Sequence, residues 1–161
     1  MGNTKPIKRS VYIIPFSREH HGALLFCWKI RWGIHLNVSL QRIRRYVQWF
    51  WENYLRSHQE EEGKLLFFDH ADSMVQKALD EHAMLSKSFE DIITGNKLEN
   101  RHFLDLADLL EEHTRYEERA LFLHLEKELS GPQLVQIGRV LYEGDRDRTA
   151  GEDYDDEFWK R

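Results

Sequence analysis

The chain has 161 residues, which fits a single domain with a sizeable core. Its formal net charge is −5, and an acidic surface does not favour nucleic-acid binding. Cys27 is the single cysteine, so no intrachain disulfide can form, and no apolar run is long enough for a transmembrane helix. We therefore expect a cytoplasmic protein that binds neither nucleic acid nor membrane.

Helices are favoured along most of the chain because its 3 prolines leave residues 16–131 without a helix-breaking residue. Apolar residues at helical spacing predict four long helices and a short fifth one, at residues 18–36, 40–67, 70–93, 99–129 and 133–142. Long helices with short connections are typical of bundles. The predicted fold is all-α, an antiparallel up-down-up-down four-helix bundle with a short C-terminal helix.

The chain divides into a bundle and two flanking segments. We expect residues 1–16 to form an extended lead-in, residues 17–142 to form the bundle, and residues 143–161 to form an acidic tail. The tail is polar enough to be loose, except where Phe158 and Trp159 dock. Two side chains that accept backbone N–H groups are expected to cap the first and third helices, and these are Ser17 and Asp69.

The motif H-x3-E-x3-L-F occurs twice, at residues 58–67 and at residues 113–122. Side chains four residues apart lie on the same face of a helix, so the histidine and the glutamate of each copy can reach one point. These pairs are His58 with Glu62, and His113 with Glu117. Two copies in one short chain suggest two facing helices that supply ligands to one metal centre.

Two more histidines, His20 and His82, lie on the inner stripes of the other two long helices. The six candidate metal ligands are therefore His20, His58, Glu62, His82, His113 and Glu117. Carboxylates inside a bundle need a cation to stay ionised. Imidazole nitrogen and carboxylate oxygen suit iron, zinc or manganese, and do not suit copper(I). We expect two metal ions bridged by Glu62 and Glu117, with open positions for a small ligand such as oxygen.

This pattern resembles the hemerythrin-like family of cation-binding helical bundles. The matching elements, between residues 16 and 129, are Glu19-His20, His58 with Glu62, Glu81-His82 followed by Leu85, and His113 with Glu117-Glu118 and Leu121-Phe122. The resemblance implies a four-helix bundle around a non-haem di-iron centre. It also implies binding of oxygen or a related small ligand, or sensing of iron or redox state.

The sequence departs from the oxygen carriers of that family at two points. Those carriers have a second histidine four residues from the third-helix histidine, whereas Ala78 and Ser86 flank His82 here. They also use a carboxylate five residues after the last histidine, which would be Glu118 rather than Glu117. Reversible oxygen carriage is therefore not the favoured role. The choices between Glu117 and Glu118, and between His20 and His21, stay open on sequence alone.

Two other functions fit the same residues. The centre could be a di-iron peroxidase or oxidase, or the chain could be a metal-free helical interaction module whose protein partner is unknown. A ferritin-like oxidase needs two E-x-x-H pairs, and only Glu99 with His102 has that spacing. The chain contains no H-E-x-x-H motif, glycine-rich phosphate loop or nucleophile elbow. A metal-binding or sensing protein is favoured over an enzyme.

Overall fold

A computed structural model describes residues 9–143 and 153–160, and every regular element in these residues is helical. The elements are α1 (Ile14–His35), α2 (Leu40–Phe50), η1 (Trp51–Leu55), α3 (Arg56–Leu65), α4 (Ser73–Thr94), α5 (Asn100–Tyr116), η2 (Glu117–Leu121), α6 (Phe122–Glu128) and α7 (Gly131–Glu143). The segments η1 and η2 are π-helical and continue the α-helices on either side of them. The predicted all-α class is confirmed for this part of the chain.

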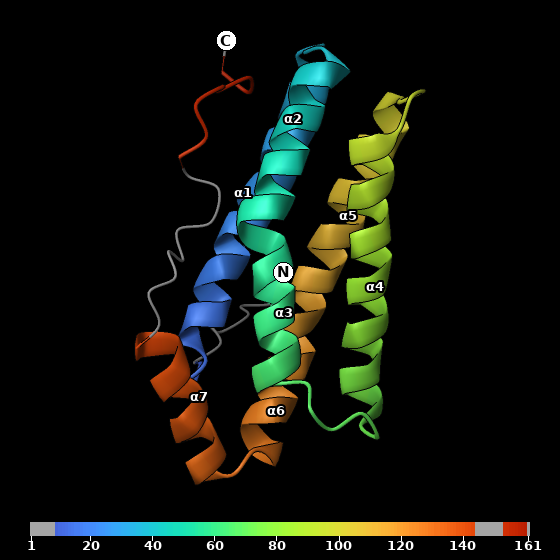
Figure 1. Cartoon of the computed structure of the whole chain (residues 1–161). Coiled ribbons are helices and arrows are strands. Elements are labelled where there is room, and N and C mark those ends of the chain that lie inside the picture. Colours follow the sequence, from blue (N-terminus) through green and yellow to red (C-terminus); the bar gives the residue numbers. More distant parts are fainter. Residues whose placement is uncertain (1–8, 144–152, 161) are drawn as a thin grey trace, which may run out of the picture.

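The helices make four long rods that lie side by side in Figure 1, with α7 at one end. The first rod is α1, the second is α2–η1–α3, the third is α4, and the fourth is α5–η2–α6. Residues 36–39, 66–72 and 95–99 connect them. The first rod packs most extensively on α5, and α4 packs on both α5 and α2. One face of each rod therefore meets a common interior.

The first rod begins earlier than predicted. Its helix starts at Ile14, so residues 14–16, which were expected to be extended, are helical. Pro15 lies in the first turn, where a backbone N–H has no intrahelical acceptor in any case. Ser17 consequently lies inside the helix and does not cap it. Residues 1–8 of the expected lead-in lie outside the described residues.

Two other helix boundaries also differ from the prediction. The third rod begins at Ser73 rather than at residue 70, because the side chain of Asp72, not that of Asp69, accepts the N–H groups of its first turn. The short fifth helix, α7, begins at Gly131, two residues before its predicted start at residue 133. The remaining predicted ends lie within two residues of the observed ones.

Two π-turns occur in the rods that carry a His–Glu pair. In η1 the N–H of Arg56 bonds to the carbonyl of Trp51, and in η2 the N–H of Phe122 bonds to the carbonyl of Glu117. A π-turn holds about one residue more than an α-turn, so it rotates the residues that follow by about 100°. The first π-turn directly precedes the helix of His58. It therefore rotates His58 and Glu62 relative to α2, whereas the second π-turn begins at Glu117 and rotates α6 relative to α5.

The interior contains two apolar clusters with a polar layer between them. The upper cluster in Figure 1 includes the stacked rings of Phe26 and Phe50, and the lower cluster includes Phe16 and Phe122. On every rod the predicted site residues fall between the two clusters: His20 between Phe16 and Ala23, His58 and Glu62 between Leu55 and Leu66, His82 between Ala78 and Leu85, and His113 and Glu117 between Leu110 and Leu121. The four rods thus bring these residues to one level.

The C-terminal segment 153–160 docks on the upper part of the rods. Phe158 is buried in the upper cluster and lies so close to Gly33 that a Cβ there would be 2.7 Å from its ring. The ammonium of Lys29 lies 4.0 Å from the centre of the Trp159 ring. The predicted docking of Phe158 and Trp159 is confirmed, and the expectation of a loose tail is wrong for this segment. Residues 144–152 lie outside the described residues.

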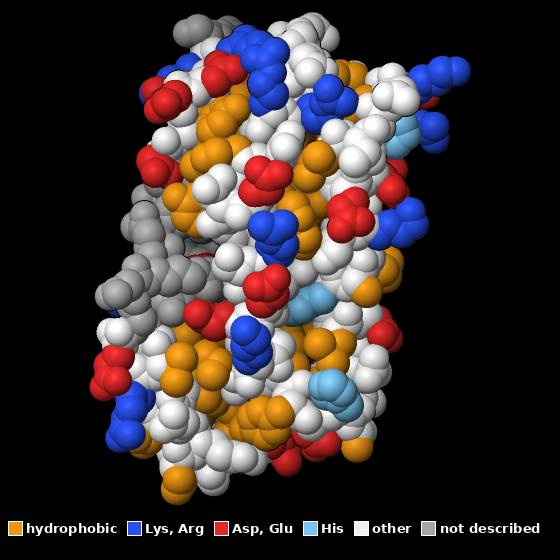
Figure 2. Space-filling model, viewed as in Figure 1, with side chains coloured by type: hydrophobic (Ala, Val, Ile, Leu, Met, Phe, Trp, Pro, Cys, Tyr) orange, Lys and Arg blue, Asp and Glu red, His pale blue; other side chains and the backbone are white. Residues whose placement is uncertain are grey.

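The outer surface carries charges of both signs. Figure 2 shows acidic and basic side chains intermixed over one face, with hydrophobic side chains between them. Among the helices of the described residues, none combines the length and the apolar character needed to cross a membrane.

Candidate metal centre

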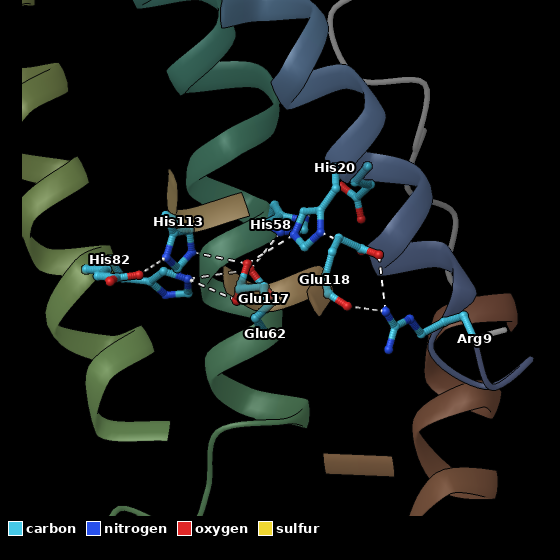
Figure 3. A network of polar contacts seen from close by, with 10 residues as sticks. Arg9, His20, His58, Glu62, His82, His113, Glu117 and Glu118 are labelled. Carbon is cyan, nitrogen blue, oxygen red and sulfur yellow. Dashed lines mark hydrogen bonds and ion pairs between the residues drawn. The ribbon is translucent and has the colours of Figure 1, made fainter. Parts of the chain in front are cut away.

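The structure brings all six predicted site residues together in the polar layer (Figure 3). They come from four rods: His20 from α1, His58 and Glu62 from α3, His82 from α4, His113 from α5, and Glu117 from the start of η2. None of the six is more than 7% exposed. His21 is exposed and lies outside the cluster. Glu118 contacts His20 from the side away from the centre.

The Nε2 atoms of the four histidines converge on the two carboxylates. The distances from Nε2 to the nearest carboxylate oxygen are 3.0 Å for His20 to Glu117, 3.1 Å for His113 to Glu117, 2.7 Å for His58 to Glu62, and 3.5 Å for His82 to Glu62. His82 Nε2 is also 3.8 Å from the second oxygen of Glu117. Glu62 therefore faces histidines from two rods, and Glu117 faces histidines from three.

The ligand atoms form two groups, each within 4.8 Å, that can hold a metal ion. The first ligand group is His20, His58, Glu62 and Glu117, and the second is His82, His113 and Glu117. Glu117 belongs to both groups. Glu62 is assigned to the first group, but its Oε1 atom also lies 3.5 Å from His82 in the second. Both carboxylates are placed so that they can be shared by two neighbouring ions.

Most of the inward-facing polar atoms have no hydrogen-bond partner. Both side-chain oxygens of Glu62 and of Glu117, and the Nε2 atoms of His20, His58 and His82, are buried and make no hydrogen bond of good geometry, although they lie within ion-pair distance of one another. Buried polar atoms in proteins are rarely left in this state. A cation between them would give every one of these atoms a partner. The donor set of neutral nitrogens and anionic oxygens therefore fits a metal ion.

The close contacts between imidazoles and carboxylates shift their protonation equilibria. Burial lowers the pKa of His113, but Glu117, Glu81 and Glu62 together outweigh burial and raise that pKa to about 10. Burial likewise lowers the pKa of His58, yet Glu62 and Glu19 hold it well above its ordinary value. Burial raises the pKa of Glu117, whereas His113 and His20 hold it well below its usual range. Without a metal, protons on the imidazoles neutralise the carboxylates.

Carboxylates also face the outer nitrogens of three of the histidines. The Nδ1 atom of His20 lies 2.8 Å from Glu118, that of His113 lies 2.8 Å from Glu81, and that of His58 lies 3.5 Å from Glu19. A carboxylate on Nδ1 keeps the proton there and leaves the lone pair of Nε2 free to bind a metal. Glu118 and Glu81 thus fix the orientation and the tautomer of His20 and His113, whereas Nδ1 of His58 makes no hydrogen bond of good geometry with Glu19.

The roles of Glu19 and Glu81 were missed in the sequence. Each directly precedes a site histidine, but each faces a histidine of another rod. Adjacent residues on a helix are rotated by about 100°, so a glutamate next to an inward histidine points toward a neighbouring helix. A glutamate that directly precedes an inward histidine is the signal that could have identified them.

A small cavity adjoins the first ligand group. The space that the centre of a water-sized molecule can occupy in it is about 10 Å³. This is close to the minimum that holds one water. Polar and apolar side chains line it together with the site residues, namely Glu19, Ala23, Phe50, Tyr54, Leu55, Gln59, Leu110 and Thr114. The hydroxyl of Tyr54 donates a hydrogen bond to Asp153 of the docked C-terminal segment. Only a ligand of a few atoms fits between this wall and the centre.

Comparisons of the chain with protein-family models, with curated proteins and with solved structures find no match. The geometry of the buried His/Glu cluster is therefore the basis for a function.

Proposed function

We propose that this chain is a hemerythrin-like di-iron protein, an antiparallel up-down-up-down four-helix bundle that binds oxygen or a related small ligand, or senses iron or redox state. The observation that carries the proposal is the convergence of four Nε2 atoms on two buried carboxylates that lack hydrogen-bond partners. Leaving these atoms unpaired in a closed interior is costly. Metal binding offsets that cost.

The number of ions follows from the two ligand groups. His20 and His58 would hold one ion, His82 and His113 would hold the other, and Glu62 and Glu117 would bridge them. Two carboxylates and four neutral imidazoles would not fill the coordination positions of two octahedral metal ions such as iron. Both ions would therefore keep open positions for a further ligand. Bound iron would supply the redox chemistry, and zinc or manganese is compatible with the same donors.

The protein residues around the centre have separate tasks. Glu118 and Glu81 hold the imidazoles of His20 and His113 in the binding tautomer, and the charge of Glu19 lies near His58. Phe16 and Phe122 pack against the rings of His58 and His20 and exclude bulk water from that side. The cavity beside the first ligand group admits a ligand of a few atoms. Its size favours oxygen or a similar molecule over an organic substrate.

Peroxide reduction at the same centre is the second candidate function, because hydrogen peroxide is nearly as small as oxygen. Turnover of peroxide above that of free iron would favour this enzyme, and its absence would favour binding or sensing. A metal-free interaction module is disfavoured by the unpaired buried atoms of Glu62 and Glu117.

Metal analysis of untagged protein, combined with an absorption spectrum in air, tests the proposal. We expect about two irons per chain and ligand-to-iron charge-transfer bands. A single zinc would retain the site but remove the redox function. Folded protein that neither contains nor takes up a metal would refute the proposal.

A further inference from the structure

Arg9 connects the segment before α1 to the rod that carries Glu117. Its side chain is 6% exposed. It donates hydrogen bonds to the backbone carbonyl and the carboxylate of Glu118, and to the carboxylate of Glu126. Figure 3 shows the guanidinium beside Glu118, on the side away from the metal centre. A buried guanidinium with several charge-assisted hydrogen bonds fixes the groups that it contacts.

Two of the residues that Arg9 contacts, Glu118 and Phe122, also contact His20. One oxygen of Glu118 lies 2.8 Å from His20 Nδ1, while the other lies 3.3 Å from Arg9. The ring of Phe122 stacks on His20 with a centroid distance of 5.3 Å and an interplanar angle of 13°. The guanidinium lies 5.4 Å from the centre of the same Phe122 ring. Arg9 thus reaches His20 through a carboxylate at its edge and through an aromatic ring at its face.

The second ligand group has a weaker version of this support. Glu81, which faces His113, is paired with Lys77 of its own helix. The Lys77 side chain is 54% exposed, and exposed ion pairs contribute little. The two ligand groups therefore differ in how firmly their histidines are held from outside.

We propose that Arg9 is a positioning residue for the first ligand group, so that residues 9–13, directly before α1, support the metal centre. The inference rests on the proposed two-ion centre. Without Arg9, Glu118 and Phe122 lose the contact that holds both of them against His20. Loss of such an outer partner lowers metal affinity by about 10- to 100-fold. The loss is expected at one of the two ions only, because the described residues that Arg9 contacts, namely Glu118, Phe122 and Glu126, do not face His82 or His113.

Titration of metal-free protein with cobalt(II) under anaerobic conditions tests this inference. Calorimetry measures the affinity of each binding step, and the visible cobalt spectrum reports the ligand geometry. The step that His20→Ala abolishes identifies the first ligand group. Arg9→Met is expected to weaken that step by about 10- to 100-fold and to change its spectrum, while the other step keeps its affinity. Lys77→Met, the matched control on the other side, is expected to leave both steps unchanged.

Arg9→Lys is the second variant, and it guards against a failure of Arg9→Met to fold. Lysine keeps the charge, but its single nitrogen cannot reproduce the fork that joins Glu118 to Glu126. We expect an intermediate loss at the first step. Unchanged cobalt affinities in the Arg9 variants would overturn the inference. Equal weakening of both binding steps would also overturn it, because that result indicates a general destabilisation of the protein. Wild-type protein that binds no cobalt would overturn the proposed centre itself, and this inference with it.

Discussion

Replacing Glu117 by glutamine removes the charge of the carboxylate that both ligand groups share. The amide has nearly the same shape, so the fully buried site keeps its packing. An amide nitrogen or a neutral oxygen replaces an anionic oxygen that lies 3.0 Å from His20 Nε2 and 3.1 Å from His113 Nε2. We expect Glu117→Gln to lose most of the stabilisation that metal ions give to the protein.

The magnitude follows from ligand linkage. An ion present at 100 times its dissociation constant stabilises the folded state by about 2.7 kcal/mol. Two independent ions therefore contribute roughly 5 kcal/mol. For a chain of this size, each kcal/mol shifts the melting temperature by about 2–4 °C. Metal loading should raise the Tm of the wild-type protein by about 10–20 °C, and that of Glu117→Gln by less than half as much.

Thermal unfolding followed by circular dichroism, with and without a buffered concentration of free metal, measures this difference. The comparison uses the change in Tm on metal addition, because Glu117→Gln also removes the partner of His113 in the metal-free protein. Glu111→Gln is the control, since Glu111 lies on the same rod but pairs with Arg31 and Arg115 at the surface. The reasoning is refuted if metal raises the Tm of Glu117→Gln as much as that of the wild type.

Four other outcomes are expected. Because the pKa of His113 is raised to about 10, the metal-free protein carries a proton there at pH 7. The ion pair between protonated His113 and Glu117 gives its full stabilisation to the metal-free fold at any pH below the ordinary histidine pKa of about 6.5. This stabilisation is lost as the pH rises through about 10. Metal binding must displace this proton, so the metal affinity should rise with pH over that interval. Calorimetry in two buffers of different ionisation enthalpy should detect the proton release, and equal binding enthalpies in both buffers would contradict this. Phe158→Ala should lower the free energy of unfolding, measured by urea titration, by up to about 3–5 kcal/mol. Gly33→Ala should undock the same segment and change tryptophan fluorescence, and an unchanged spectrum would show that the close approach is relieved without undocking. Cys27, whose pKa burial raises to about 12, should react with iodoacetamide only after unfolding; rapid labelling of native protein would show that its cover opens.

The sequence determined those features that depend on local geometry. A spacing of four residues puts two side chains on one helical face in any protein, so His58 and Glu62, and likewise His113 and Glu117, had to face the same way. The lack of proline across residues 16–131 allowed long helices. These two facts predicted the all-α class and the two His–Glu pairs, whose role as metal ligands stays a prediction.

Other features could not be predicted because the sequence offers more than one local conformation of similar stability. Asp69 and Asp72 are both good N-caps, and only the path of the preceding connection selects Asp72. The π-turns have no sequence signature, because an i→i+5 bond forms where packing on both sides requires an extra residue. Docking of Phe158 could be predicted from its apolar character, but the site that receives it depends on the absence of a side chain at Gly33.

The tertiary structure alone decided which side chains support the centre from outside. Glu81 adjoins His82 in sequence but pairs with His113, and Arg9 lies 109 residues from its partner Glu118. Such pairs depend on the level and rotation of each rod relative to its neighbours. Both quantities are set by the packing of the two apolar clusters as a whole, which no local spacing records. The sequence thus defined the His–Glu pairs on two of the rods, and the packing of all four rods defined the candidate centre.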